Sequence, residues 1–170
     1  MAFVRAARPD DAPQIADVHL RAWEERYPTW PDAVWRDLHS TASIDTWRRD
    51  ALAPPSSAHH ILVATDDEDR VCGFLVLEPD PDGDARIDLF EIDPHVRTQG
   101  HGSRLMSVAA EYARADSATG LTLWLDQGSP ASRFLTESGW GPRGVRRVLE
   151  IVDGVHLSQH QWWTALGDDR

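Results

Sequence analysis

The sequence predicts a mixed α/β domain in which helices cover both faces of one sheet. Three observations support this fold class. The 170 residues suffice to bury one core, strand-like and helix-like segments are interspersed, and no repeat or low-complexity linker divides the chain. Hydrophobic residues make up 41% of the chain, which is ordinary for a globular protein. We therefore assign residues 1–170 to a single domain.

The N-terminal part is predicted to be a short strand followed by helices. Residues 3–7 fit the strand. Apolar residues at helical spacing predict a helix over about 11–26, with acidic residues and Pro13 in its first turn. Further helical patterns cover about 31–39 and 43–52.

The middle of the chain reads as three strands. Residues 59–65 and 70–78 are apolar runs joined by the acidic turn DDED, which predicts a hairpin. A second turn leads to a third strand over 85–92.

The last part is predicted to alternate helices and strands. Ser129 is the candidate N-cap of the shorter helix, Gly139 is its terminator, and the turn at Asp153 joins the last two strands. The expected elements are a helix over 103–115, a strand over 121–125, a helix over 129–140, and strands over 145–152 and 155–163.

Composition argues against several classes of protein. The chain has 17 basic residues, all of them Arg, against 28 acidic ones, and a net charge of −11 disfavours binding to nucleic acid. No apolar run has membrane-spanning length, and the N-terminus lacks a secretory apolar segment, so we expect a cytoplasmic protein without a membrane partner. The single cysteine, Cys72, excludes an intramolecular disulfide and a cysteine metal cluster.

The segment RTQGHG, residues 97–102, has the features of an anion site. It follows a predicted strand and precedes a helix, whose first N–H groups lack internal partners. Gly100 and Gly102 allow close backbone approach. A dinucleotide fingerprint would need glycine where Leu105 stands, and a Walker loop would need a lysine, which the chain lacks. The pattern Arg-x-x-Gly-x-Gly remains, and we expect it to bind phosphate.

Three segments resemble the GNAT superfamily of acyl-CoA-dependent N-acyltransferases. Residues 15–28 are similar to the first helix of many bacterial members, 90–106 to the pyrophosphate motif, and 131–140 to the helix beside the pantetheine arm. The resemblance covers nearly the whole chain. It implies the GNAT fold, a central mixed and largely antiparallel twisted sheet of about six or seven strands, splayed at the acyl-CoA site.

The resemblance also implies a cosubstrate and its site. Acetyl-CoA, the commonest acyl donor of the family, would lie with its pantetheine arm beside Ile92 and near Phe134. Backbone amides of the loop would hold its pyrophosphate: Arg97, Thr98, Gln99, Gly100, His101, Gly102 and Ser103. No metal is expected, because the paired histidines lack a third ligand at metal-site spacing.

The implied reaction is direct attack of an amine on the thioester. An amine with a pKa near 10 arrives mostly protonated, so a base must remove its proton. Asp88 is the first candidate, since family members commonly carry an acid there, and strand alternation would place it on one face with Phe90 and Ile92. Glu91 is second, because a bulge could bring it into register. Asp126 is third.

One position departs from the family pattern. The family's tyrosine, which commonly protonates the leaving thiolate, is replaced by Leu135, and its asparagine by Gly128. Water, Ser132, Tyr112 or a substrate group could supply the proton instead.

The resemblance further implies an acceptor site near the N-terminal helices. Trp23, Tyr27 and Trp30 cluster there, and their rings could hold a cationic amine. The predicted function is acyl-CoA-dependent N-acylation of an amine on a small molecule or peptide. The alternative is a non-catalytic acyl-CoA-binding module of the same fold. A homodimer is compatible with the sequence.

Overall fold

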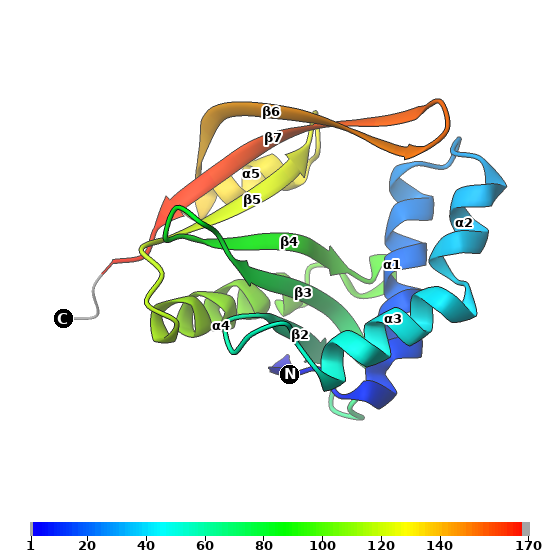
Figure 1. Ribbon diagram of the computed structural model, residues 1–170, viewed down its shortest axis with the longest axis horizontal. Helices are drawn as coiled ribbons and strands as arrows, with labels where there is room; N and C mark the ends of the chain where they lie inside the picture. Colours follow the sequence, from blue (N-terminus) through cyan, green and yellow to red (C-terminus); the bar gives the residue numbers. More distant parts are fainter. Residues whose placement is uncertain (1, 168–170) are drawn as a thin grey trace.

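Seven strands form one mixed sheet, which confirms the predicted fold class. The computed structural model describes residues 2–167 (Figure 1). Across the sheet the order is β1-β2-β3-β4-β5-β7-β6, and all neighbours are antiparallel except β4 and β5. The strands are β1 (Phe3–Ala6), β2 (His60–Thr65), β3 (Val71–Pro79), β4 (Ala85–Ile92), β5 (Gly120–Asp126), β6 (Gly141–Val152) and β7 (Val155–Ala165).

Helices cover both faces of this sheet (Figure 1). On one face α1 contacts β3 and β4 and carries α2 and α3 beside it, while α4 lies across the other face with α5. The helices are α1 (Ala12–Arg26), α2 (Asp32–Leu38), α3 (Thr41–Leu52), α4 (His101–Ala115) and α5 (Ala131–Glu137). None of those within residues 2–167 combines the length and apolar character that crossing a membrane requires.

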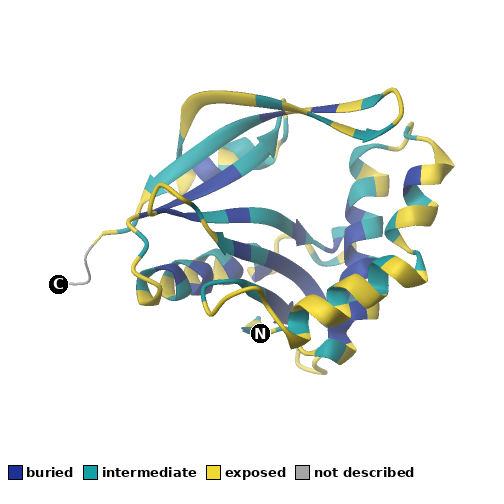
Figure 2. Ribbon diagram, in the orientation of Figure 1, coloured by how far each residue is buried: buried dark blue, intermediate teal, exposed yellow. Residues whose placement is uncertain are grey.

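Strand alternation divides the core between the two faces. Leu62 and Leu75 pack with Leu105 of α4, whereas their neighbours Val63 and Phe74 pack with α1. Figure 2 shows buried residues concentrated in the central strands and on the inner sides of α1 and α4. The outer sides of α3 and β6 are exposed. The central strands are therefore anchored from both sides.

The sheet opens between β4 and β5. These strands pair only where residues 85–87 face residues 121–123. In the β3–β4 ladder Leu77 faces Ile87 but Val76 faces Leu89, so Asp88 is an extra, bulged residue. A bulge bends its strand and breaks the local ladder. The splayed sheet that the family resemblance implies is thus present, and the opening begins at Asp88.

Element boundaries differ from the prediction by up to four residues, notably in α4, α5 and β6. Helix α4 begins at His101 rather than 103, because Gly100 takes a left-handed conformation (φ 86°) and ends the preceding loop. Helix α5 is limited to 131–137, although the Ser129 hydroxyl does accept a hydrogen bond from the Ala131 N–H (3.3 Å). Strand β6 begins at Gly141 rather than 145, since a bulge between Pro142 and Arg146 lets the ladder continue.

Candidate active site

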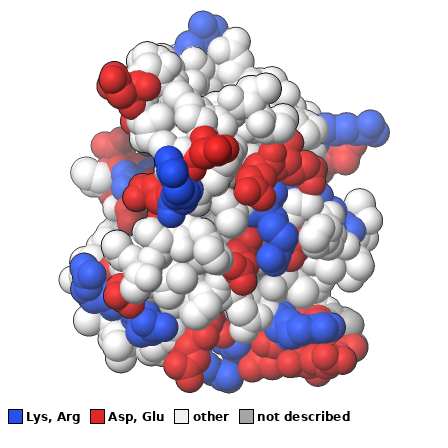
Figure 3. All heavy atoms as spheres, turned by 90° about the vertical axis from the view of Figure 1, so that its right-hand side faces the viewer, with Lys and Arg blue, Asp and Glu red and all other residues white. Residues whose placement is uncertain are grey.

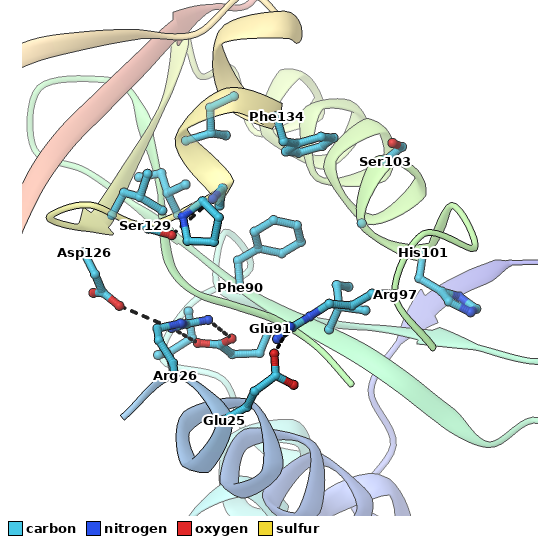
Figure 4. A pocket seen from close by; sticks show the side chains of 18 of the residues that line it. Glu25, Arg26, Phe90, Glu91, Arg97, His101, Ser103, Asp126, Ser129 and Phe134 are labelled. Atoms are coloured by element: carbon cyan, nitrogen blue, oxygen red, sulfur yellow. Dashed lines mark hydrogen bonds and ion pairs between the residues drawn. The ribbon is translucent and has the colours of Figure 1, made fainter. Parts of the chain in front are cut away.

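A cavity of about 760 Å³ opens between the separated ends of β4 and β5 (Figure 4). Its wall combines α1, β4, the loop before α4, the first turn of α4, the end of β5, and α5. Elements that are distant in the sequence therefore meet where the sheet has lost its ladder.

At one end of the cavity lies the N-terminus of α4. The helix's first i→i−4 hydrogen bond runs from the Arg104 N–H to the Gly100 carbonyl (3.0 Å). The N–H groups of His101, Gly102 and Ser103 consequently have no partner within the helix. Because the helix dipole adds partial positive charge there, this end is suited to an anion such as phosphate.

The loop backbone is shaped for close approach. Thr98 has a positive φ of 65°, an uncommon conformation for a residue with a side chain, and such strain is typical of ligand-binding loops. A Cβ atom on Gly102 would lie 3.4 Å from Phe90 Cζ and 3.7 Å from Ile92 Cγ1. The helix end thus lies directly against β4, with room at position 102 for a small side chain only.

Most residues predicted to bind the cosubstrate line this cavity. They are Ile92, Arg97, Thr98, Gly100, His101, Gly102, Ser103 and Phe134. Gln99 is not among the lining residues. The Arg97 guanidinium forms a close ion pair with Glu25 of α1, so the loop is tied across the cavity mouth (Figure 4).

His101 is an unusual residue for this end of the cavity. Its side chain is buried, and its Nδ1 atom has no hydrogen-bond partner among the described residues. Burial lowers the pKa of the ring below its ordinary value. His101 is therefore neutral at neutral pH and adds no charge to the phosphate end.

Asp88 lies on the bulge itself, at the point where the cavity begins. Its carboxylate is 40% exposed and lies 3.6 Å from Arg86 Nε. Arg86 points away from the face that Ile87, Phe90 and Ile92 share beneath α4. The prediction that Asp88 shares a face with Phe90 and Ile92 is therefore wrong, because the bulge shifts the alternation of β4 by one residue.

Glu91 points to the α1 side and is buried in an ion pair. Arg26 Nη2 lies 2.6 Å from Glu91 Oε2, and Arg26 Nη1 donates to Oε1 at 3.0 Å. The Trp23 indole N–H donates to the same Oε1 at 2.9 Å. Both carboxylate oxygens are thus engaged, and the pair fastens α1 to β4 beside the cavity.

Asp126, at the end of β5, is the centre of a second set of contacts. It accepts a very short hydrogen bond from the Tyr27 hydroxyl, one from Gln159 Nε2 (2.8 Å) and one from Arg26 Nη1 (3.3 Å). Arg26 consequently joins Glu91 to Asp126 across the gap between β4 and β5 (Figure 4). The sequence reasoning missed Arg26 and Gln159.

The aromatic residues predicted for the acceptor site do cluster, although only Trp23 lines the cavity. Tyr27 and Trp30 stack with ring centroids 4.0 Å apart, and Trp35 stacks on Trp30 at 6.1 Å. Trp23 and Arg26 stand at positions i and i+3 of α1, and Tyr27, the C-cap residue at i+4, continues the same side of the helix. That spacing is the signal that could have identified Arg26.

The position of the missing tyrosine is closed to solvent. Leu135 is fully buried in the core beneath α4, yet it contributes to the cavity wall. Of the substitute proton donors considered above, Tyr112 packs against His60 and neither it nor Ser132 lines the cavity. Ser129 does line it.

Two other kinds of site, a metal centre and a basic surface, would compete with this cavity. Among residues 2–167 no group of three or more His, Cys, Asp or Glu side chains could hold a metal ion. Figure 3 shows acidic and basic side chains interspersed over the face it presents, with no continuous basic surface there.

Comparison with known proteins decides the family. The family model described as the acetyltransferase (GNAT) family matches residues 13–141. The chain belongs to this family. It is 24% identical over 164 residues to the uncharacterized N-acetyltransferase YuaI of Bacillus subtilis strain 168, covering 94% of this chain and 90% of that protein.

Solved structures of the family share the fold. The yncA protein of Salmonella typhimurium, solved with its cofactor acetyl-CoA, superposes with a TM-score of 0.75 at 15% identity, covering 100% of this chain and 96% of that one. The PaiA N-acetyltransferase of Thermoplasma acidophilum, solved in complex with coenzyme A, gives a TM-score of 0.71 at 14% identity, covering 97% and 99%. At these identities the likeness establishes the architecture of this GNAT member.

Proposed function

We propose that this GNAT protein transfers an acetyl group from acetyl-CoA directly to an amine of a small molecule or peptide. One observation carries the proposal. The cavity lies where β4 and β5, the only parallel neighbours among the described residues, stop pairing. Helix N–H groups without a partner within the helix lie at one end of it, and carboxylates lie at the other. That arrangement suits a reaction between an anionic donor and a cationic acceptor.

The residues at the phosphate end fit a coenzyme A pyrophosphate. The N–H groups of His101, Gly102 and Ser103 would donate to phosphate oxygens, and Arg97 would offset their charge. The absence of a side chain on Gly102 keeps the approach open. The pantetheine arm would then follow the unpaired edge of β4 past Ile92 toward Asp88.

Asp88 is our candidate for the base that takes the proton of the acceptor. Its side chain lines the cavity, and its only ion-pair partner in the described chain is Arg86 at 3.6 Å, which leaves carboxylate lone pairs free. Glu91 has both oxygens engaged by Arg26 and Trp23. We assign Glu91 and Asp126 the role of holding α1 against the open sheet.

Proton delivery to the leaving thiolate cannot come from Leu135. The Ser129 hydroxyl accepts the Ala131 N–H, so its own O–H is free to donate into the cavity. A proton donor adds little here. With a thiol pKa near 8.5, releasing the thiolate unprotonated at pH 7 costs only roughly 2 kcal/mol more than releasing the thiol. We propose that Ser129 or water supplies this proton.

The direct test is release of free thiol from acetyl-CoA in the presence of a panel of amines, with acetylated product identified by mass spectrometry. We expect turnover with at least one acceptor class and loss of turnover in Asp88→Asn. Tight binding of acetyl-CoA by calorimetry, without turnover on any amine, would instead favour the non-catalytic module. Leu135 at the position of the family's tyrosine is the observation that favours this second function.

A further inference from the structure

Arg147 of β6 is a cation beside the cavity with no acidic partner in the described chain. Its guanidinium carbon lies 4.3 Å from the centroid of the Trp124 ring. Its Nε donates to Gln159 Oε1 at 2.7 Å. No carboxylate within residues 2–167 reaches ion-pair distance of it, and its terminal nitrogens have no hydrogen-bond partner there.

The side chain is held on the acceptor face of the sheet. Arg147 faces Gln159 across β6 and β7, and Gln159 faces Asp126 across β7 and β5. The Gln159 amide joins the two, since it accepts from Arg147 and donates to Asp126 Oδ1. Trp124 and Asp126 both line the cavity. Arg147 is thus fixed next to its wall, on the side where Tyr27 and Arg26 approach.

Its situation differs from that of Arg26 and Arg97, the two arginines that line the cavity. Arg26 is neutralised by Glu91 and Asp126, and Arg97 by Glu25. Arg147 is half-buried and unneutralised, and burial lowers the pKa of its guanidinium, although Asp88 and Asp126 act on it in the opposite direction. Because Trp124 and Gln159 fix the side chain while its charge has no acidic partner among residues 2–167, the guanidinium is placed to receive an anion.

We propose that Arg147 binds a carboxylate, or a similar oxyanion, carried by one of the two reactants, and so sets the specificity of the enzyme. A guanidinium that is stacked on an aromatic ring and oriented through Nε presents its remaining N–H groups to bind an oxyanion. Asp88 and Asp126 lie close enough to act on it electrostatically. An acceptor that carries both an ammonium and a carboxylate group, such as an amino acid, matches a site with these carboxylates beside one guanidinium. The proposal rests on the proposed acyltransfer.

The same chemistry could come from an acyl chain that ends in a carboxylate. The experiment therefore has two arms. In the first, acetyl-CoA is offered with pairs of acceptors. Each pair consists of an amino acid and the corresponding amine that lacks the carboxylate. In the second, acetyl-CoA and succinyl-CoA are compared with one neutral amine. Each arm is run with the parent protein, Arg147→Gln and Arg147→Lys.

We expect Arg147→Gln to lower kcat/KM for the carboxylate-bearing acceptors about tenfold to a hundredfold, mainly through KM, and to leave the matched amines unchanged. Arg147→Lys should recover part of the loss. The control is Arg146→Gln, since Arg146 is the exposed neighbour that alternates to the other face of β6. A loss confined to succinyl-CoA would support the same anion site with the acyl chain as its source.

An equal loss for both members of each pair, or no preference of the parent in either arm, would overturn the proposal. Calorimetry with N-acetyl amino acids and N-acetyl amines, titrated into the CoA-loaded protein, tests the site without turnover. A parent that preferred the acids through Arg147 but transferred no acetyl group would retain this inference and refute the proposed function. Equal binding of both series, together with no Arg147-dependent preference for succinyl-CoA over acetyl-CoA, would refute the inference alone.

Discussion

The two ends of the cavity are built in different ways. The proposed phosphate end comes from one continuous stretch, residues 93–105, and presents backbone N–H groups and glycines. The proposed acceptor end is assembled from α1, β4, β5, β6 and β7, and presents side chains such as Arg26, Asp126 and Gln159. A site made by local backbone geometry is encoded by short-range spacing, whereas one made by long-range pairing depends on the register of the whole sheet.

The largest expected effect is at the acceptor end. If Asp88 accepts the proton of the amine, Asp88→Asn should lower kcat by roughly 10²–10⁴ at neutral pH. The loss should shrink as pH approaches the amine pKa near 10, because free amine then needs no base. Steady-state kinetics from pH 6.5 to 9.5 would measure both. Asp153→Asn, in the exposed β6–β7 turn, is a matched control.

Glu91→Gln tests whether Asp88 or Glu91 is the base. The variant leaves the partly buried Arg26 charge without its main partner, so we expect lower stability. Among the molecules that remain folded, we expect a smaller loss of kcat than in Asp88→Asn. Full activity in Asp88→Asn together with an inactive but folded Glu91→Gln would transfer the base to Glu91 and reverse the roles proposed for β4.

The same contrast explains what the sequence could predict. Glycines at 100 and 102, between a strand and an amphipathic helix, predict the anion end because the backbone N–H groups that form it come from one turn of chain. Asp88 could be named from its position, but its face could not be, since one bulged residue inverts the alternation of a strand. Gln159 and Arg147 carry no local signal at all. They become neighbours of Asp126 only through the β5–β7–β6 order.

A second effect concerns a buried histidine of α1. His19 is buried against Trp23, Trp47 and Phe74, and burial lowers its pKa to about 4 from an ordinary 6.5. Between those pH values the unfolded chain binds a proton that the native protein excludes, so the free energy of unfolding must fall as pH falls. From pH 7 to pH 4.5 we expect a loss of about 2 kcal/mol from this residue.

Urea unfolding of the parent and His19→Leu at both pH values measures that contribution. The variant should lose less stability on acidification, whereas His156→Gln, at an exposed position of β7, should match the parent. Asp11 and Asp93 do not interfere, because their pKa values are lowered below 3.8 and their stabilisation is lost at still lower pH. If the free energy of unfolding changed equally with pH in the parent and in His19→Leu, the His19 ring would be solvated rather than buried.

A third test returns to the phosphate end. Gly102→Val should weaken CoA binding at least tenfold in calorimetry, because a branched side chain on the first turn of α4 meets Phe90 and Ile92 and displaces the helix end. Gly102→Ala is the graded control, since a lone Cβ would make ordinary contacts of 3.4 and 3.7 Å. Unchanged CoA affinity in a folded Gly102→Val protein would contradict the backbone cradle.

The smallest effect links the two ends through Glu25, whose carboxylate pairs with Arg97 across the cavity mouth. Both side chains are about half exposed, so the pair itself stabilises little. When a pyrophosphate arrives, Glu25 competes for Arg97 and repels the ligand. Glu25→Gln should therefore tighten CoA binding about two- to fivefold at low salt, and less as salt screens the charges. Glu24→Gln, on the neighbouring exposed position of α1, should change Kd little. Weaker binding in Glu25→Gln would mean that Glu25 positions Arg97 for phosphate and that the phosphate end, too, depends on a long-range side chain.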